Sequence, residues 1–210
     1  MGKLSIGING PVQGKVGSVI GSSWRGIPYI KGPYKKRTGE AGAGEAGNRN
    51  KFGEAQRWLK PLLKFVREGF KGYTDTVQGF IAAKSYLLLH AVEDRSTGTY
   101  INPALVLVSY GDLPLPADIA VLKPVAGRLD FSWDGSAMPD AHAKDQVMML
   151  AYDVDHGRAY FNTLGQFRSV GADTLYTDPA PGRQYHVYCA FTAADRKRQS
   201  DSVYLGLVTM

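Results

Sequence analysis

Cysteine and histidine are scarce in this chain of 210 residues, which contains one cysteine and four histidines. The lone Cys189 excludes an internal disulfide and a metal cluster held by cysteines alone. It lies in an apolar stretch, where a buried hydrophobic role is expected rather than a nucleophilic one. No two histidines have the short spacing of a zinc site. We therefore expect neither a metal ion nor any other cofactor.

Long apolar runs are also missing. None approaches the roughly 18 residues that span a bilayer, and the best candidate, residues 80–92, is interrupted by Lys84 and His90. Residues 1–15 lack the continuous apolar core of a secretion signal. We expect no membrane partner and synthesis in the cytoplasm without a signal peptide. Later incorporation into a virion or an extracellular particle stays open.

The sequence contains no pattern that predicts catalysis. No glycine-rich stretch ends in Gly-Lys-Ser/Thr, and none has the strand–turn–helix context of a dinucleotide-binding fingerprint. The best acidic cluster is Asp153 and Asp155, near Asp140 and Asp145, but a calcium loop requires a third oxygen ligand and a later glutamate. Turn chemistry explains these aspartates equally well. We expect no enzyme and identify no small-molecule substrate.

Acidic residues are few in the first half of the chain. Residues 1–100 contain sixteen Lys and Arg against seven Asp and Glu, whereas residues 101–210 contain nine against twelve. The two halves therefore differ in charge and in the partners that they favour.

Glycine is abundant at the start, since residues 1–53 hold thirteen of the twenty-five glycines. The pattern predicts two strands over residues 14–31, joined by a turn at Arg25 and Gly26. Pro28 cannot donate to a ladder, so we expect the return strand at an edge or a bulge. Because an isolated hairpin is marginal in water, this one requires a surface to lie on.

This hairpin is the predicted assembly element. Its apolar, aromatic and basic residues are the candidates for the contact: Val16, Val19, Ile20, Trp24, Arg25, Ile27, Tyr29 and Lys31. Glycines allow a second backbone to approach closely, and the two cations favour an acidic surface. A homo-oligomer or a larger protein assembly is then the expected partner. The alternative, that the hairpin completes a sheet of its own chain, stays open.

Binding of nucleic acid is a rival hypothesis for the basic half. Its candidate residues are Lys35, Lys36, Arg37, Lys60, Lys64 and Arg67. Cations interleaved with aromatic residues are typical of single-strand binding, but no recognised nucleic-acid motif is present.

Helical periodicity follows a glycine-rich connector that ends at residue 47. Apolar residues from Phe52 to Phe70 recur at helical spacing, with a break expected at Pro61. A second helix is predicted from Thr76 to His90, and together the two helices form a hairpin. A strand is expected within residues 100–110, and prolines at 114 and 116 predict a linker.

Short alternating segments fill the rest of the chain. Seven strands are predicted over residues 119–123, 128–133, 146–152, 158–162, 174–177, 184–192 and 202–208. This pattern indicates a small antiparallel sandwich. The segment resembles a fibronectin type III domain, in which Trp133 corresponds to the core tryptophan and Tyr185 to the corner tyrosine. The resemblance implies an adhesive or spacer module without catalysis.

Four short motifs are distinctive: Met-Gly-Lys-Leu-Ser at the start, Gly-Lys-Val-Gly at residues 14–17, Val-Ile-Gly-Ser-Ser-Trp-Arg-Gly at residues 19–26, and Ser-Val-Tyr-Leu-Gly at residues 202–206. Through these motifs the whole chain resembles DUF6266, a family of uncharacterised Bacteroidetes proteins. This resemblance implies an origin and an architecture rather than a mechanism.

The sequence thus predicts an α+β protein with four parts. Residues 1–47 form a glycine-rich basic β-hairpin and arm, residues 48–113 a helical hairpin and a strand, residues 114–117 a proline linker, and residues 118–210 a sandwich of the fibronectin III or immunoglobulin type. We expect a non-enzymatic structural protein that assembles through its hairpin, in a phage-derived virion, tail or injection particle. A nucleic-acid-binding protein and a surface adhesion or glycan-binding module are the alternatives.

Overall fold

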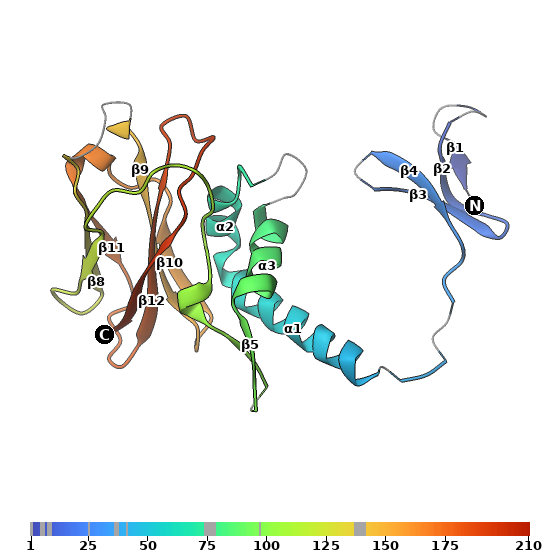
Figure 1. The fold of residues 1–210 in the computed structure, drawn as a ribbon, viewed down its shortest axis with the longest axis horizontal. Coiled ribbons are helices and arrows are strands. Elements are labelled where there is room, and N and C mark those ends of the chain that lie inside the picture. Colours follow the sequence, from blue (N-terminus) through green and yellow to red (C-terminus); the bar gives the residue numbers. More distant parts are fainter. Residues whose placement is uncertain are drawn as a thin grey trace. The chain divides into compact units, whose positions relative to one another are not determined.

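A computed structural model of the chain (Figure 1) describes residues 2–4, 7, 10–24, 26–35, 38–40, 42–73, 79–96, 98–136 and 142–210. The chain forms two compact units, Met1–Ala43 and Gly44–Met210, called here the amino-terminal unit and the main unit. The predicted α+β class with a carboxy-terminal antiparallel sandwich is confirmed.

The amino-terminal unit is a small antiparallel sheet. Its described strands are β1 (Lys3–Leu4), β2 (Val12–Val16), β3 (Val19–Trp24) and β4 (Ile27–Lys31), paired in that order. The sequence predicted one strand before the turn at residues 25–26, but the structure has two. The difference arises at Gly17, whose φ of 57° makes a left-handed turn between Val16 and Val19.

These strands pair with one another and not with the sandwich, as far as the described residues show. The sheet is also tightly curled, because β2 crosses close to Gly21. A Cβ atom at Gly21 would lie 2.0 Å from the backbone oxygen of Val12.

The main unit begins with helices. They are α1 (Ala43–Leu59), a 3₁₀ turn (Lys60–Leu62), α2 (Leu63–Gly69) and α3 (Gly79–His90). The turn contains Pro61, where a break was predicted. Helix α1 begins at Ala43, inside the predicted connector, and an ion pair between Glu45 and Arg49 (2.7 Å) lies one turn apart on it. Thr76, the predicted start of the second helix, lies outside the described residues.

A short hairpin follows, made of β5 (Val92–Arg95) and β6 (Gly98–Ile101). The strand predicted over residues 100–110 ends at Ile101 and gives way to a 3₁₀ turn over Pro103–Leu105. The reason is local, because the side chain of Asn102 accepts a hydrogen bond from the backbone of Ala104 (3.1 Å) and caps this turn.

The sandwich has strands close to those predicted. They are β7 (Ala120–Leu122), β8 (Arg128–Ser132), β9 (Gln146–Asp153), β10 (Arg158–Asn162), β11 (Ala172–Tyr176), β12 (Gln184–Thr192) and β13 (Val203–Thr209). In the described chain they form one sheet in the order β10-β9-β12-β13 and a second in the order β11-β8-β7.

The helices and the sandwich share one core. Side chains that alternate along β9 and β12, among them Leu150 and Tyr188, pack against α1, α2 and α3, while their neighbours Met149 and Cys189 face the other sheet. Figure 1 shows the resulting layers, with helices on one side of the β9–β12 sheet and β8 and β11 on the other. The helical part and the sandwich predicted as separate parts therefore lie in one compact unit.

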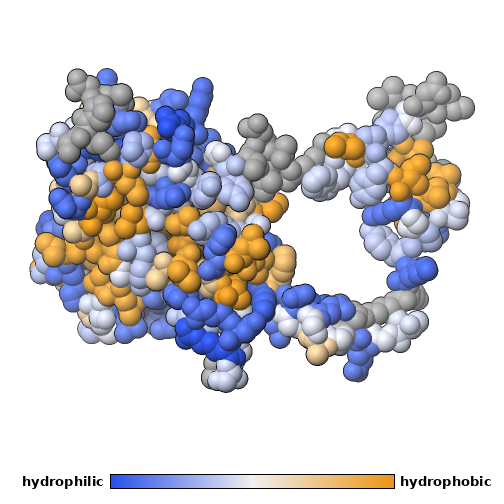
Figure 2. Space-filling model, viewed as in Figure 1, coloured by the Kyte–Doolittle hydropathy of each residue, from blue (hydrophilic) through white to orange (hydrophobic). Residues whose placement is uncertain are grey.

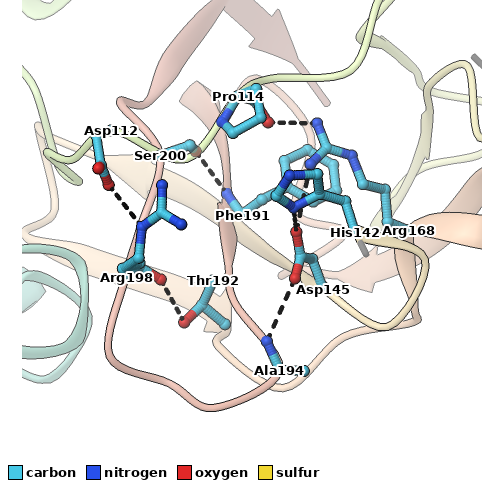
Figure 3. Close-up of polar contacts among 10 residues, drawn as sticks. All are labelled: Asp112, Pro114, His142, Asp145, Arg168, Phe191, Thr192, Ala194, Arg198 and Ser200. Atoms are coloured by element: carbon cyan, nitrogen blue, oxygen red, sulfur yellow. Dashed lines mark hydrogen bonds and ion pairs between the residues drawn. The ribbon is translucent and has the colours of Figure 1, made fainter. Parts of the chain in front are cut away.

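The proline linker is fixed within that unit, as Figure 3 shows. The fully buried guanidinium of Arg168 donates to the backbone oxygen of Pro114 and lies 3.5 Å from the carboxylate of Asp145. The backbone N–H of Leu113 donates to Gln199 (3.0 Å), and Arg198 pairs with Asp112 (3.0 Å). The segment is thus tied to the sandwich rather than free between two domains.

Candidate interaction surfaces

The amino-terminal unit has no apolar core within the residues described. Gly21 is its one described buried residue, whereas Trp24, Ile27 and Ile30 are 61, 65 and 67 % exposed. Figure 2 shows apolar side chains gathered on the drawn face of this unit. A sheet normally buries one face against another layer, and the described residues of this unit supply no such layer.

The strand register gives the sheet two different faces. One side of the sheet carries two rows of paired residues. The first row crosses β2, β3 and β4 and consists of Lys15, Ile20 and Lys31, and the second consists of Trp24 and Ile27. Tyr29 shares this side, called here the basic-aromatic face. The opposite, uncharged face carries Val16, Val19, Pro28 and Ile30. Of the predicted assembly residues, only Val16 and Val19 lie on the uncharged face, and Arg25 is outside the described residues.

Both faces of the sheet carry exposed side chains, among them Ile27 on the basic-aromatic face (65 %) and Ile30 on the uncharged face (67 %). On the uncharged face, the start of the chain lies against the sheet, since a Cβ atom at Gly2 would lie 2.3 Å from Val16 Cγ2. On the basic-aromatic face, the ammonium group of Lys31 donates to the hydroxyl of Tyr34 (2.6 Å). That hydrogen bond raises the pKa of Lys31 above its usual value, so the lysine stays charged at neutral pH.

The edge of the sheet is less suited to binding than its face. Strand β4 is an edge strand, and its ladder to β3 continues on both sides of Pro28. The proline nitrogen, which has no hydrogen to donate, therefore faces the free edge. Proline on an edge strand discourages the addition of a further strand.

Nearly all of the net charge belongs to this unit. Residues 1–43 contain seven Lys and Arg and one Glu, while residues 44–210 contain eighteen of each sign. The predicted basic half is thus a basic amino-terminal unit joined to a unit of zero formal net charge.

The basic residues proposed for nucleic acid lie in both units. Lys60, Lys64 and Arg67 are exposed along one side of the α1–α2 region and have no ion pair among the described residues. Lys35 is exposed in the amino-terminal unit, and Lys36 and Arg37 lie outside the described residues.

A pocket of about 300 Å³ opens in the main unit between α1, β6 and β12. Its described lining residues are Glu54, Trp58, Thr99, Tyr100, Ile101, Pro103, Val154, Asp155, Gln184 and His186. The guanidinium carbon of Arg95 lies 3.3 Å from the centroid of the Tyr100 ring and covers one face of it. The sequence did not indicate this pocket, because its residues come from four separate segments.

His186 is part of this pocket. It is partly buried, and its Nδ1 lies 2.8 Å from the hydroxyl of Tyr204. Burial lowers the pKa of His186, and the nearby Asp155 acts weakly in the opposite direction. The imidazole is therefore neutral at pH 7.

Trp133, Tyr185 and Cys189 lie in the core of the main unit. Trp133 and Tyr185, the predicted core residues, are 5 and 0 % exposed. The indole N–H of Trp133 donates to the backbone of Arg168 (2.7 Å), and the hydroxyl of Tyr185 donates to the backbone of Asp178 (3.2 Å). Complete burial raises the pKa of the Cys189 thiol far above its usual range, which removes its nucleophilic form.

Two aspartates are buried with partners. Asp145 accepts from His142 (2.9 Å) and pairs with Arg168 (Figure 3). Burial alone would raise the pKa of Asp153, but hydrogen bonds from Arg183 and His156 lower it below its usual value. Within the described chain, no group of three or more His, Cys, Asp or Glu could hold a metal ion. None of the described helices is long and apolar enough to cross a membrane.

These features define an α+β protein in which a helical layer and a sandwich share one core, preceded by a basic antiparallel sheet. The chain belongs to DUF6266, a family of unknown function, whose model matches residues 11–206. The match includes β2, β3 and β4 as well as the main unit. A comparison with curated proteins found no significant match.

Proposed function

We propose that this protein is a non-enzymatic structural protein that assembles by docking its amino-terminal sheet onto another protein surface. The observation that carries the proposal is a sheet with no core of its own and with large apolar side chains left in solvent. Exposed apolar patches of this kind are typical of interaction sites.

The contact uses the basic-aromatic face rather than the edge of the sheet. Trp24, Ile27 and Tyr29 lie together on that face, and burial of each contributes about 1.5–3 kcal/mol. Lysines around this patch favour an acidic partner and exclude a basic one. Because β4 carries Pro28 at its free edge, strand addition at that edge is disfavoured.

The main unit serves as a rigid spacer in this proposal. A fibronectin type III relationship is supported by seven described strands in two antiparallel sheets, by the buried Trp133, and by the hydroxyl of Tyr185 on a backbone oxygen upstream. One docking sheet and one spacer per chain form a head-to-tail unit, which closes into a ring or grows into a filament. A phage-derived virion, tail or injection particle is the context that we propose.

Light scattering on the full chain tests this function. The variant Trp24→Ser with Ile27→Ser is expected to remain folded and monomeric under conditions in which the natural chain assembles. Its control is Leu122→Ser with Tyr176→Ser, since these side chains of the main unit are equally exposed at 69 and 70 %. Equal masses for the natural chain and the docking variant would exclude the proposal.

Nucleic acid is the second candidate partner of the same face. The ammonium group of Lys31 lies 4.6 Å from the ring centroid of Tyr34 and 5.9 Å from that of Tyr29, so a cation and two aromatic rings are held together. Fluorescence anisotropy with a labelled single strand is the test. Binding whose affinity falls steeply with salt concentration supports this candidate, and its absence at low salt rejects it.

A further inference from the structure

We propose that the basic-aromatic face of one copy binds the pocket between α1, β6 and β12 of a second copy. This inference rests on the proposed function, because it identifies the receptor for the docking sheet. The ligand class is a primary ammonium group on an aliphatic chain, supplied by the lysines of the face.

The described lining residues of the pocket include two carboxylates and neither Lys nor Arg. Glu54 of α1 and Asp155 of the turn between β9 and β10 supply these carboxylates, and the guanidinium of Arg95 covers one face of the lining Tyr100. A hollow beside Asp173 has that residue as the one charged group of its described lining, and two other hollows of the main unit are mixed in charge. The one outside β7, β8 and β11 includes Arg128, and another includes Lys197 and Arg198. A lysine side chain therefore finds the most favourable charge in the first pocket.

Both carboxylates are available to a ligand. Asp155 is exposed and forms no ion pair within the described chain. Glu54 pairs with Arg57 (2.7 Å), but this arginine is 76 % exposed. Exposed pairs of this kind contribute little, so Glu54 can exchange its partner at small cost. His186 is neutral at pH 7, for the reason given above, and does not oppose a cation.

The walls of the pocket suit the methylene chain of a lysine. Trp58, Ile101, Pro103 and Val154 are apolar lining residues. Trp58 is held in place by an edge-on contact with Tyr152, at 4.9 Å between ring centroids. Lysine side chains commonly bury their aliphatic stems along such surfaces while the ammonium group remains at a charged or wet site.

The sheet presents lysines in a matching arrangement. Lys15 and Lys31 flank Ile20 in one row across three strands, which places the two lysine backbones roughly 10 Å apart. Lys15 is exposed and has no partner among the described residues, whereas Lys31 is held by Tyr34. Lys15 is therefore the lysine that enters the pocket, and Lys31 lies at its rim.

The partner is a second copy because the charges of the two surfaces are complementary. Trp24 and Ile27 of the face and Asp155 of the pocket are exposed. The amino-terminal unit contains seven Lys and Arg and one Glu, so its positive charge is not balanced by acidic residues of the same unit. A second copy supplies an acidic pocket and offers its own sheet to a third, as a head-to-tail contact requires.

A charge-exchange experiment on the full chain tests the contact. The pocket variant is Asp155→Lys, and the sheet variant combines Lys15→Glu with Lys31→Glu. Each is expected to weaken self-association at least about tenfold in sedimentation equilibrium at low salt. An equimolar mixture of the two variants is expected to associate again, because each then offers the other a complementary surface. Glu68→Lys on α2 makes the same change of charge away from the pocket and is expected to associate as the natural chain does.

Each outcome separates this inference from the proposed function. If the natural chain associates, the Trp24→Ser/Ile27→Ser variant does not, and Asp155→Lys still does, the sheet docks elsewhere and the inference is wrong. If both charge variants dissociate but their mixture does not recover, the face and the pocket do not meet. If the natural chain is monomeric at every concentration, both the inference and the proposed function fail. The neutral variant Asp155→Asn is the control for an effect of the introduced lysine on folding. It is expected to weaken self-association less than Asp155→Lys does.

Discussion

Tyr152 couples α1 to the central sheet, and the destabilisation expected from its removal is smaller at alkaline pH than at neutral pH. Its buried hydroxyl donates to the backbone oxygen of Trp58 (2.9 Å). Loss of one buried hydrogen bond in Tyr152→Phe is expected to lower the free energy of unfolding by about 1 kcal/mol at pH 7. Burial also raises the pKa of Tyr152 to about 12. A group with a raised folded-state pKa stabilises fully below its unfolded value and loses that contribution as pH rises.

The window for this loss runs from about pH 10, the ordinary value for tyrosine, to about 12. At pH 11 the unfolded state ionises Tyr152 while the folded state does not, which costs the natural protein about 1 kcal/mol. Tyr152→Phe escapes that cost, and the remaining tyrosines titrate in both proteins. Urea unfolding measures the free energy of unfolding of the natural protein and of Tyr152→Phe. The two values are expected to differ by about 1 kcal/mol at pH 7 and to be nearly equal at pH 11. A difference that is the same at both pH values would refute the reasoning.

Three further predictions concern the core, the thiol and the sheet. Arg168→Met leaves Asp145 buried without its cation and is expected to lower the free energy of unfolding by about 3–5 kcal/mol. Asp112→Ala, which breaks an exposed ion pair, is expected to lower it by less than about 1 kcal/mol. Urea unfolding measures both values. Cys189 is expected to react with a thiol reagent only in denaturant, since it is fully buried; rapid labelling of the native protein would contradict this. Gly21→Ala is expected to abolish assembly and leave the main transition in calorimetry unchanged, because its Cβ atom would meet the Val12 backbone.

Sequence patterns predicted the strands of the sandwich well, because turns and apolar alternation mark each one. Strands β9 and β12 each contain a continuous run of apolar residues rather than an alternation of apolar and polar ones. Periodicity alone does not explain these runs. Both strands are buried on two faces, by the helices on one side and by the second sheet on the other. Prolines at 114 and 116 predict a linker, and contacts with Arg168 and Gln199, which are distant in sequence, tie this segment to the sandwich.

The candidate surfaces were only partly predictable. Apolar residues and glycine content predicted a hairpin over residues 14–31, since these signals are local. The division of its residues between two faces depends on the register set by the turn at Gly17, which was not recognised. The pocket joins Glu54 of α1 to Asp155 and His186, more than ninety residues further along the chain. No local pattern reveals such a site, because only the packing of α1 on the sandwich creates it.

Hydrogen exchange measured at several protein concentrations tests the central claim most directly. Docking buries the face of the sheet that carries Trp24 and Ile27, so amides of β3 and β4 are expected to exchange more slowly as concentration rises. Amides of β9 and β12 already lie in the core of the main unit and are expected to show no such change. Exchange in β3 and β4 that is independent of concentration, across a range in which the chain associates, would show that the amino-terminal sheet is not the docking element.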